Sequence, residues 1–353
     1  MAGSGMRRGS PGHATTMRGA SLTSTRWLSL VVALAVGLIC AAPAGADRAP
    51  RREAGAQAVG PAAGHGPFAG RVAIRGGRRL YLECRGSGRP TVMLEAGSGN
   101  LGSTWTELRA EAEALGIAPV GPGRAILPAV ARFTRVCAYD RPGTYRYPDT
   151  LSRSDPVAMP RTTLDIVRDL HALLRAAGAP RPFVLAGHSY GGMVARLYAT
   201  NHPRAVAGLV SIDAQNEDYA AALKRLLPPD VYVANVLAPQ PPPALVSYRA
   251  LELLDLEASA AQMRQAQADT PLRRMPFVVL SHSRTIPNPF GFPPEFPAEA
   301  LESAFQDSQD MLARLVPGAK HVIATKSAHY IQLYQPRLVT DAIHRVVRKV
   351  RRR

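Results

Sequence analysis

"FVLAGHSYGGMVARLYA", residues 183–199, runs from an apolar segment through a glycine-flanked serine into a segment with helical spacing. The serine is Ser189, the middle residue of a G-x-S-x-G motif. A sharp turn from strand to helix strains the backbone of this middle residue, and small flanking residues let strand and helix approach closely. The turn also places Ser189 near a helix N-terminus, where backbone N–H groups can hold an oxyanion. The motif therefore predicts an activated nucleophile; the alternative is an idle hydroxyl in a glycine-rich turn.

Strands alternate with helices on both sides of this motif. "PTVMLEAG" (90–97) and "FTRVCAYD" (133–140) are typical of buried strands, and "TTLDIVRDLHALLRAAG" (162–178) is a strongly amphipathic helix. This alternation predicts the α/β class, with a mostly parallel central sheet flanked by helices. Further strands are expected at 71–76, 78–86, 205–213, 275–283 and 320–327, and further helices at 103–116 (capped by Ser103), 298–315 and 335–350.

The 353 residues suit one α/β domain with an insertion. Residues 1–46 are expected to be a signal peptide and residues 47–69 a flexible lead-in. The core is expected over 70–213 and 276–350. Residues 214–275 break the strand rhythm, are rich in Ala and Leu, and predict a helical cap insertion.

The N-terminus predicts export. Arg18 and Arg26 precede an apolar run over 27–42, and Ala44 and Ala46 follow in A-x-A spacing. We expect cleavage near Ala46 and a secreted or envelope-associated protein; the alternative is an uncleaved membrane anchor.

The formal net charge of +17 suggests nucleic acid or an anionic surface as a partner. The arginines are scattered, however, apart from "RKVRRR" at 348–353, and no zinc-ligand spacing or aromatic-basic interleaving accompanies them. A solvated basic surface with weak attraction to an anionic envelope is therefore expected, without a specific nucleic acid. After cleavage, Cys84 and Cys137 would remain; in an oxidising compartment they can pair, or they can be two small buried hydrophobes.

A serine nucleophile needs a base. Of the nine histidines, His329 in "KSAHYIQLYQP" follows the last expected strand and precedes the last expected helix. That position suits a general base, and the alternative is an ordinary surface-loop histidine.

With these pieces placed, the chain resembles the α/β-hydrolase superfamily over about 70–350, and looks like its exported actinobacterial-type serine hydrolases and esterases. The segments that carry the resemblance are "LEAGSGN", "CAYDRPG", "GHSYGG", "SIDA" and "SAHYIQLYQP". The resemblance implies that Ser189 is the nucleophile and His329 the general base. The backbone N–H groups of Tyr190 and Ser98 would form the oxyanion hole, although Ser98 can also be a plain turn residue and Ala96 replaces the family's usual histidine.

The acid is the point of departure from the family. Its commonest position follows the seventh strand, but "FVVLSHSRTIPNPFGF" (277–292) contains no Asp or Glu. Some members carry the acid after the sixth strand, which implies Asp213. The alternative is that Asp213 only caps the strand end. Glu217, Asp307 and Asp310 are the other candidates for the acid. A site without any acid would be a dyad or catalytically weak.

The resemblance has two further structural implications. The second and fourth strands of the family are neighbours, which implies a disulfide between Cys84 and Cys137. Asp140 is expected to be structural, paired with a backbone turn or with Arg141.

The activity implied is hydrolysis of carboxylic esters, small or lipid-like, through an acyl-enzyme and without metal or organic cofactor. Epoxide hydrolase and haloalkane dehalogenase chemistry is disfavoured, because those relatives use Asp where Ser189 stands. A peptidase, an acyltransferase or a catalytically degenerate secreted binding protein are the alternatives. The residues predict no oligomeric state.

Overall fold

The structure, a computed structural model, describes residues 51–52, 66–117, 121–248 and 250–353. The predicted signal peptide and most of the predicted lead-in lie outside the described residues. In the part of the chain that is described, no helix has the length and apolar character needed to cross a membrane.

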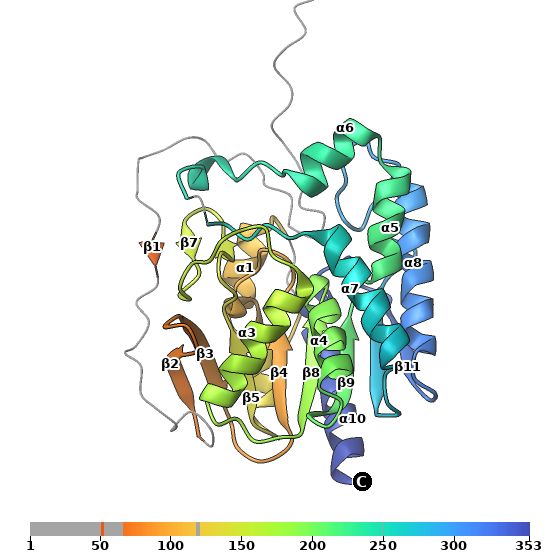
Figure 1. Ribbon diagram of the computed structural model, residues 1–353. Coiled ribbons are helices and arrows are strands. Elements are labelled where there is room, and N and C mark those ends of the chain that lie inside the picture. Colours follow the sequence, from red (N-terminus) through yellow and green to blue (C-terminus); the bar gives the residue numbers. More distant parts are fainter. Residues whose placement is uncertain (1–50, 53–65, 118–120, 249) are drawn as a thin grey trace, which may run out of the picture. The chain divides into compact units, whose positions relative to one another are not determined.

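A central sheet organises the fold (Figure 1). Among the described residues it has eight strands in the order β11-β10-β9-β8-β4-β5-β3-β2. The strands from β11 to β5 are parallel, whereas β3 pairs antiparallel with both β5 and β2. The bounds are β2 Phe68–Ala73, β3 Arg79–Arg85, β4 Thr91–Glu95, β5 Val136–Tyr139, β8 Phe183–His188, β9 Val206–Ile212, β10 Phe277–His282 and β11 Lys320–Ala324. Short strands β1 (Arg51–Arg52), β6 (Tyr145–Arg146) and β7 (Thr150–Leu151) form a separate small sheet.

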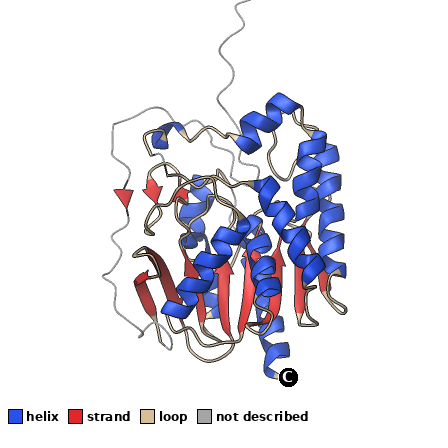
Figure 2. Ribbon diagram, viewed as in Figure 1, coloured by secondary structure: helices blue, strands red, loops and turns tan. Residues whose placement is uncertain are grey.

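Helices cover both faces of the central sheet (Figure 2). Successive strand residues point to opposite faces: Leu185 of β8 packs with α3 (Thr163–Ala176) and α4 (Tyr190–Asn201), while Val184 packs with α2 (Ile126–Val130) and α10 (Pro336–Arg351). Because both faces of the central strands pack against apolar cores, their sequences are continuous hydrophobic runs. The remaining helices are α1 Leu108–Ala114, α8 Ala298–Arg314 and α9 Ile331–Tyr334.

The segment predicted as a helical cap, 214–275, contains helices α5 (Glu217–Leu226), α6 (Pro229–Tyr232) and α7 (Leu256–Asp269). A π-helical turn, Val233–Leu237, and a 3-10 turn, Pro243–Leu245, lie between α6 and α7. Helix α7 differs from the rest of the segment, because Met263 on it is buried in the same core as α3 and α4. The part near α6 lies at the top in Figure 1, beyond the carboxyl ends of the parallel strands.

The helix expected over 103–116 starts later than predicted. Residues Gly102–Trp105 form a 3-10 turn, and α1 begins at Leu108. Ser103 does not cap this helix: its hydroxyl donates instead to Glu111 Oε1 at 2.6 Å. Ser103 lies inside the 3-10 turn, and the residue at the N-cap of α1 is Glu107.

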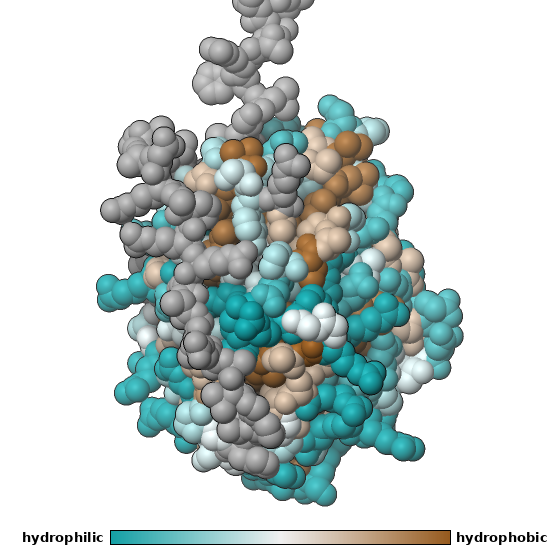
Figure 3. All heavy atoms as spheres, turned by 60° about the vertical axis from the view of Figure 1, so that its left-hand side comes forward, coloured by the Kyte–Doolittle hydropathy of each residue, from teal (hydrophilic) through white to brown (hydrophobic). Residues whose placement is uncertain are grey.

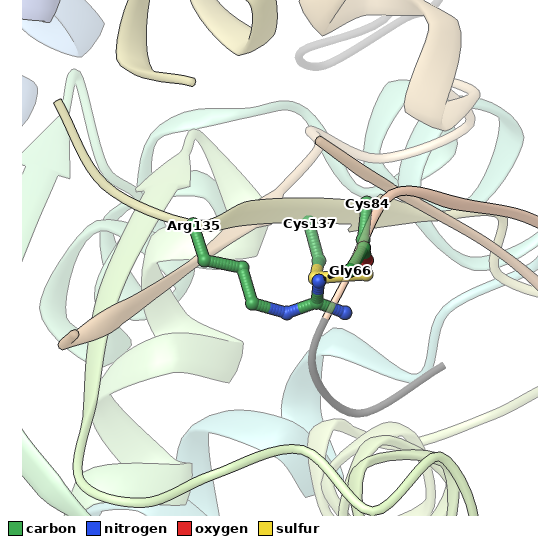
Figure 4. The surroundings of a disulfide bond; sticks show 4 residues. All are labelled: Gly66, Cys84, Arg135 and Cys137. Carbon is green, nitrogen blue, oxygen red and sulfur yellow. Dashed lines mark hydrogen bonds between the residues drawn. A yellow bond between two sulfur atoms is a disulfide. The ribbon is translucent and has the colours of Figure 1, made fainter. Parts of the chain in front are cut away.

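A disulfide joins Cys84 on β3 to Cys137 on β5 (Figure 4). The two residues face each other directly in the antiparallel pairing, with Cα atoms 4.1 Å apart. Both side chains are buried. Arg135, two residues before Cys137, donates to the carbonyl oxygen of Gly66, which precedes β2.

Candidate active site

Ser189 is the one residue between β8 and α4. Its backbone has φ 53° and ψ −126°, a conformation that residues with a side chain rarely adopt and that costs about 1–3 kcal/mol. Hydrogen bonds fix it: its N–H donates to the Ile212 carbonyl oxygen at 3.1 Å, and its own carbonyl oxygen accepts from Gly192 N and Gln215 N at 2.9 Å each. The strained strand-to-helix turn expected from the motif is thus present at Ser189.

The glycines of the motif are required by close backbone contacts. A Cβ at Gly191 would lie 2.4 Å from the Ala96 carbonyl oxygen, and one at Gly187 would lie 2.3 Å from the Gly191 carbonyl oxygen. Both contacts are with backbone, which cannot move aside as a flexible side chain can. The loop after β4 therefore packs directly against the turn that carries Ser189.

The two residues predicted to supply oxyanion donors flank Ser189. Tyr190 is the first residue of α4, where a backbone N–H has no acceptor within the helix. Ser98 lies in a tight turn closed by a 3.2 Å hydrogen bond from Asn100 N to the Gly97 carbonyl oxygen. A Cβ at Gly97 would lie 3.3 Å from Ser189 Cβ, so this turn borders the serine. No described residue accepts a hydrogen bond from the Ser98 N–H.

Arg141 holds the loop after β4. Its guanidinium donates to the carbonyl oxygens of Ala96 at 2.8 Å and Gly97 at 2.5 Å. On its other side it forms a bidentate ion pair with Glu252, with distances of 2.6 Å and 2.9 Å. Glu252 also accepts from Gly99 N at 2.7 Å. A carboxylate from the segment before α7 thereby fixes the turn on which Ser98 lies.

Of the two partners expected for Asp140, a backbone turn or Arg141, the structure has the backbone turn. Asp140 accepts from the backbone N–H of Gly102 at 2.9 Å, as a structural turn residue should. Its ion pair, however, is with Arg153 at 2.7 Å and not with its neighbour Arg141. Adjacent residues at a strand end point in opposite directions, so Arg141 faces the β4 loop and Glu252 instead.

Glu95, the last residue of β4, is fully buried beside this cluster. Burial raises the pKa of its carboxyl to about 8, and the opposing attraction of Arg141, 3.7 Å away, does not offset that cost. Glu95 is therefore mostly protonated at neutral pH, and the shorter contacts of Arg141 are those with Glu252.

His329 lies in the loop after β11, as predicted. Its Nδ1 donates to Asp213 Oδ2 at 2.7 Å. Because that hydrogen bond places the proton on Nδ1, the neutral ring keeps a lone pair on Nε2. His329 Nε2 and Ser189 Oγ are both buried and neither has a hydrogen-bond partner among the described residues.

Asp213 follows β9 directly, with φ 47°, and its side chain is fully buried. Besides His329 it accepts two hydrogen bonds from His282, one from the backbone N–H to Oδ1 and one from Nδ1 to Oδ2, both at 2.8 Å. Although burial disfavours its charge, the His282 and His329 contacts together hold the pKa of Asp213 well below its usual range. Ser189, Asp213 and His329 thus all follow the carboxyl ends of parallel strands, the edge where α/β sheets place their sites.

The three alternative candidates for the acid have other surroundings. Glu217 pairs with Arg196, Asp310 pairs with Arg284, and Asp307 is exposed. None of the three has a hydrogen bond to His329 among the described contacts.

His282 is a residue that the sequence analysis did not select. It ends β10, and its Nε2 lies 3.0 Å from both carboxylate oxygens of Glu302 on α8. A signal was nevertheless present, since His282 is a polar residue at the end of the strand where the family commonly carries its acid. The contact with Asp213 depends on strand order and could not be seen in the chain.

His188, next to the serine, supports the loop of His329. Its Nε2 donates to the His329 carbonyl oxygen at 3.1 Å, and the two rings are 4.7 Å apart. Burial, and secondarily the proximity of His329, lowers the pKa of His188 to about 3. His188 is therefore neutral at ordinary pH and acts as a hydrogen-bond donor to the loop.

Aromatic side chains form one wall of the site. The ring of Phe290, which is half-buried, lies 4.9 Å from that of His329 and 4.8 Å from that of Phe305. Tyr219 on α5 packs edge-on against Phe305 at 4.9 Å. For metals, the described part of the chain contains no group of three or more potential His, Cys, Asp or Glu ligands.

The sheet order and the site geometry define the α/β-hydrolase fold. A family model for that fold matches residues 121–245. The haloalkane dehalogenase DatA from Agrobacterium tumefaciens has a similar structure: 17% identity, a TM-score of 0.51, and coverage of 82% of this chain and 98% of that one.

Two curated proteins are similar in sequence. An AB hydrolase superfamily protein from Gibberella zeae is 24% identical over 324 residues, covering 78% of this chain and 92% of its own. A "Probable transporter efuK" from Hormonema carpetanum is 30% identical over 150 residues, which span 40% of this chain and only 18% of that protein. The first of the two is described as an α/β-hydrolase superfamily member, in line with the family model that matches residues 121–245.

Proposed function

We propose that this protein is a serine hydrolase that cleaves carboxylic esters, with Ser189 as nucleophile, His329 as general base and Asp213 as the orienting acid. The observation that carries the proposal is the hydrogen bond from His329 Nδ1 to Asp213 Oδ2, in the same buried site as the strained turn at Ser189. An ionised carboxylate on Nδ1 selects the tautomer whose Nε2 can accept a proton.

The reaction would proceed in two halves. Ser189 Oγ attacks the ester carbonyl carbon while His329 Nε2 takes its proton, and the N–H groups of Tyr190 and Ser98 stabilise the oxyanion. The intermediate collapses as the protonated His329 gives its proton to the leaving alcohol. Water, deprotonated by His329, then attacks the acyl-enzyme; the acyl–Oγ bond breaks as His329 returns that proton to Ser189 Oγ, and the acid is released.

The side chains around the proposed active site favour a substrate with an apolar acyl group. Phe290 contacts His329, and Tyr219 and Phe305 extend the same aromatic wall. Among the described residues, four large apolar side chains are exposed, and three of them, Val233, Leu237 and Val246, lie in the segment around and after α6. Figure 3 shows apolar atoms gathered in its upper part, the level at which α6 lies in Figure 1.

A catalytically degenerate binding protein is the second candidate. The observation in its favour is that no hydrogen bond joins Ser189 Oγ to His329 Nε2. Catalytic hydrogen bonds are often loose in free enzymes and tighten with substrate, so this observation leaves the hydrolase as the better-supported function.

A fluorophosphonate probe separates the two. We expect the purified protein to be labelled, and to hydrolyse short p-nitrophenyl esters, whereas Ser189→Ala does neither. Ser303→Ala, at an exposed serine on α8, is the matched control and should behave as the parent protein. Absence of Ser189-dependent labelling would refute the hydrolase and favour the binding protein.

Export is part of the proposal. It is supported by the apolar run over 27–42 and by the buried Cys84–Cys137 disulfide, since disulfides persist mainly in oxidising compartments. N-terminal sequencing of secreted material should begin near Asp47. A secreted protein that starts at Met1 would contradict cleavage.

A further inference from the structure

We propose that His282 and Glu302 are a positioning pair for the active site: an imidazolium at His282, bridging Glu302 and Asp213, keeps the Asp213 carboxylate ionised and aimed at His329 Nδ1. This inference rests on the proposed function, because it assigns the pair a role in supporting Asp213 and His329.

The position of His282 between two carboxylates favours two protons on its ring. Nδ1 lies 2.8 Å from Asp213 Oδ2, and Nε2 lies 3.0 Å from both oxygens of Glu302. Ionised carboxylates only accept hydrogen bonds, so both ring nitrogens must donate. The Gln306 amide nitrogen donates to Glu302 Oε1 at 2.8 Å and also lies 3.1 Å from His282 Nε2, so the Nε2 proton of the proposed imidazolium is directed to the Glu302 carboxylate and not to Gln306.

The surroundings of His282 contain the charges needed for this state. The side chain is fully buried, with Phe290 and Phe305 rings at 5.2 Å and 5.4 Å. The titratable groups that face it are Asp213 after β9, Glu302 on α8, His329 after β11 and, behind Phe305, Tyr219 on α5. The basic side chains Arg284 and His321 contact Asp310 instead. Burial opposes the charge, but Asp213 and then Glu302 outweigh it and raise the pKa of His282 to about 10.

His282 and Glu302 account for how the buried Asp213 carboxylate stays ionised in the resting site. An ionised carboxylate as deeply buried as Asp213 needs a cation or it takes up a proton. In the resting enzyme His329 must be neutral to act as a base, so it cannot be that cation. His282 supplies the positive charge, while its backbone N–H and Nδ1 together fix both oxygens of Asp213.

The same charge acts on His329. Both Nδ1 atoms contact the same oxygen, Asp213 Oδ2, so a cation at His282 opposes formation of a second cation at His329. Removing the His282 charge therefore favours protonated His329 and moves the acidic limb of the kcat/KM profile to higher pH, by roughly one unit or more. A residue with a merely structural role would lower activity without moving that limb.

The first experiment measures the protonation state of the two His282 ring nitrogens and does not depend on catalytic activity. In the full chain labelled with 15N-histidine, the ring signals assigned through His282→Asn should show both nitrogens protonated through pH 8. A ring with one unprotonated nitrogen at pH 7 would overturn the proposal.

The second experiment uses paired variants. His282→Asn keeps a neutral donor near Asp213 and should lower kcat/KM for a p-nitrophenyl ester at least tenfold while shifting the acidic limb upward. Glu302→Gln should shift it in the same direction by less, because the ring then loses only one of its two anions. The controls are His321→Asn, at a histidine that also bridges a carboxylate and a strand residue, and Glu299→Gln, exposed on the same helix as Glu302. Both controls should keep the parent profile.

The outcomes separate this inference from the proposed function. If the parent protein is not labelled by fluorophosphonate at Ser189, the hydrolase fails whatever the state of His282. If labelling is intact and the acidic limb is unmoved in both His282→Asn and Glu302→Gln, the positioning pair fails and the hydrolase stands. Should His282→Asn not fold, Glu302→Gln and the nitrogen spectra of the parent protein still decide the question.

Discussion

Arg141 and Glu252 are separated by 111 residues, yet they form a bidentate ion pair in which both side chains are buried. Arg141 also donates to the carbonyl oxygens of Ala96 and Gly97, and Glu252 accepts from Gly99 N. The pair therefore connects the segment before α7 to the loop that carries the Ser98 N–H. An ion pair and hydrogen bonds thus join Glu252 to the turn of the proposed oxyanion donor.

Glu252→Gln should lower kcat far more than it changes KM. The neutral amide leaves Arg141 without its charged partner and releases Gly99 N, which displaces a donor needed mainly in the transition state; loss of one such donor costs about a hundredfold or more in kcat. Steady-state kinetics with a p-nitrophenyl ester measure this. Glu257→Gln, at a half-exposed glutamate paired with Lys224, is the control and should have no effect. An unchanged kcat would show that the pair does not set the donor.

Asp213→Asn should reduce kcat by about 10⁴, because the amide can stabilise the wrong tautomer of His329 and cannot stabilise its imidazolium. Asp307→Asn, at an exposed carboxylate, should keep the full rate. Single-turnover acylation by a chromogenic ester compares the two variants. Full activity in Asp213→Asn, or a loss in Asp307→Asn, would assign the acid elsewhere.

Glu95→Gln should change how stability depends on pH. The folded-state pKa of Glu95 is raised by burial from 4.5 to about 8, so the folded protein binds this proton more tightly than the unfolded chain. Its contribution is fully present below pH 4.5 and is lost as pH rises toward about 8. In urea unfolding between pH 5 and 8, the variant should lose less stability than the parent protein. Parallel curves for the two would mean that Glu95 is ionised when buried.

The disulfide should contribute about 4 kcal/mol to stability, since it joins cysteines 53 residues apart and restricts the unfolded chain. The double variant Cys84→Ala/Cys137→Ala should unfold at correspondingly lower urea concentration under oxidising conditions. Under strong reduction the parent and the variant should become similar. Equal unfolding free energies without reductant would contradict a stabilising bond.

Much of the fold follows from local patterns. The apolar runs predict β4, β8 and β9, because strands buried on both faces need hydrophobic side chains at every position. Helix α3 was equally visible, and Thr162 and Asp165 form its capping box. Local patterns failed at Ser103, where the hydroxyl bonds to Glu111 instead of starting a helix. The short α2 was not anticipated, because five residues carry too little periodicity.

The sequence by itself determined the turn at Ser189, since only a chain with glycines at 187 and 191 can bring β8, α4 and the β4 loop so close together. It also indicated Asp213 and His329 as candidates, through their places after expected strands. The tertiary structure alone decided which groups surround them. Strand order brings the ends of β9 and β10 side by side, so His282 reaches Asp213 and Glu302 at once. The same holds for Arg141 and Glu252. Electrostatic contacts between distant segments depend on distances of a few ångströms, and no local pattern in a chain encodes those.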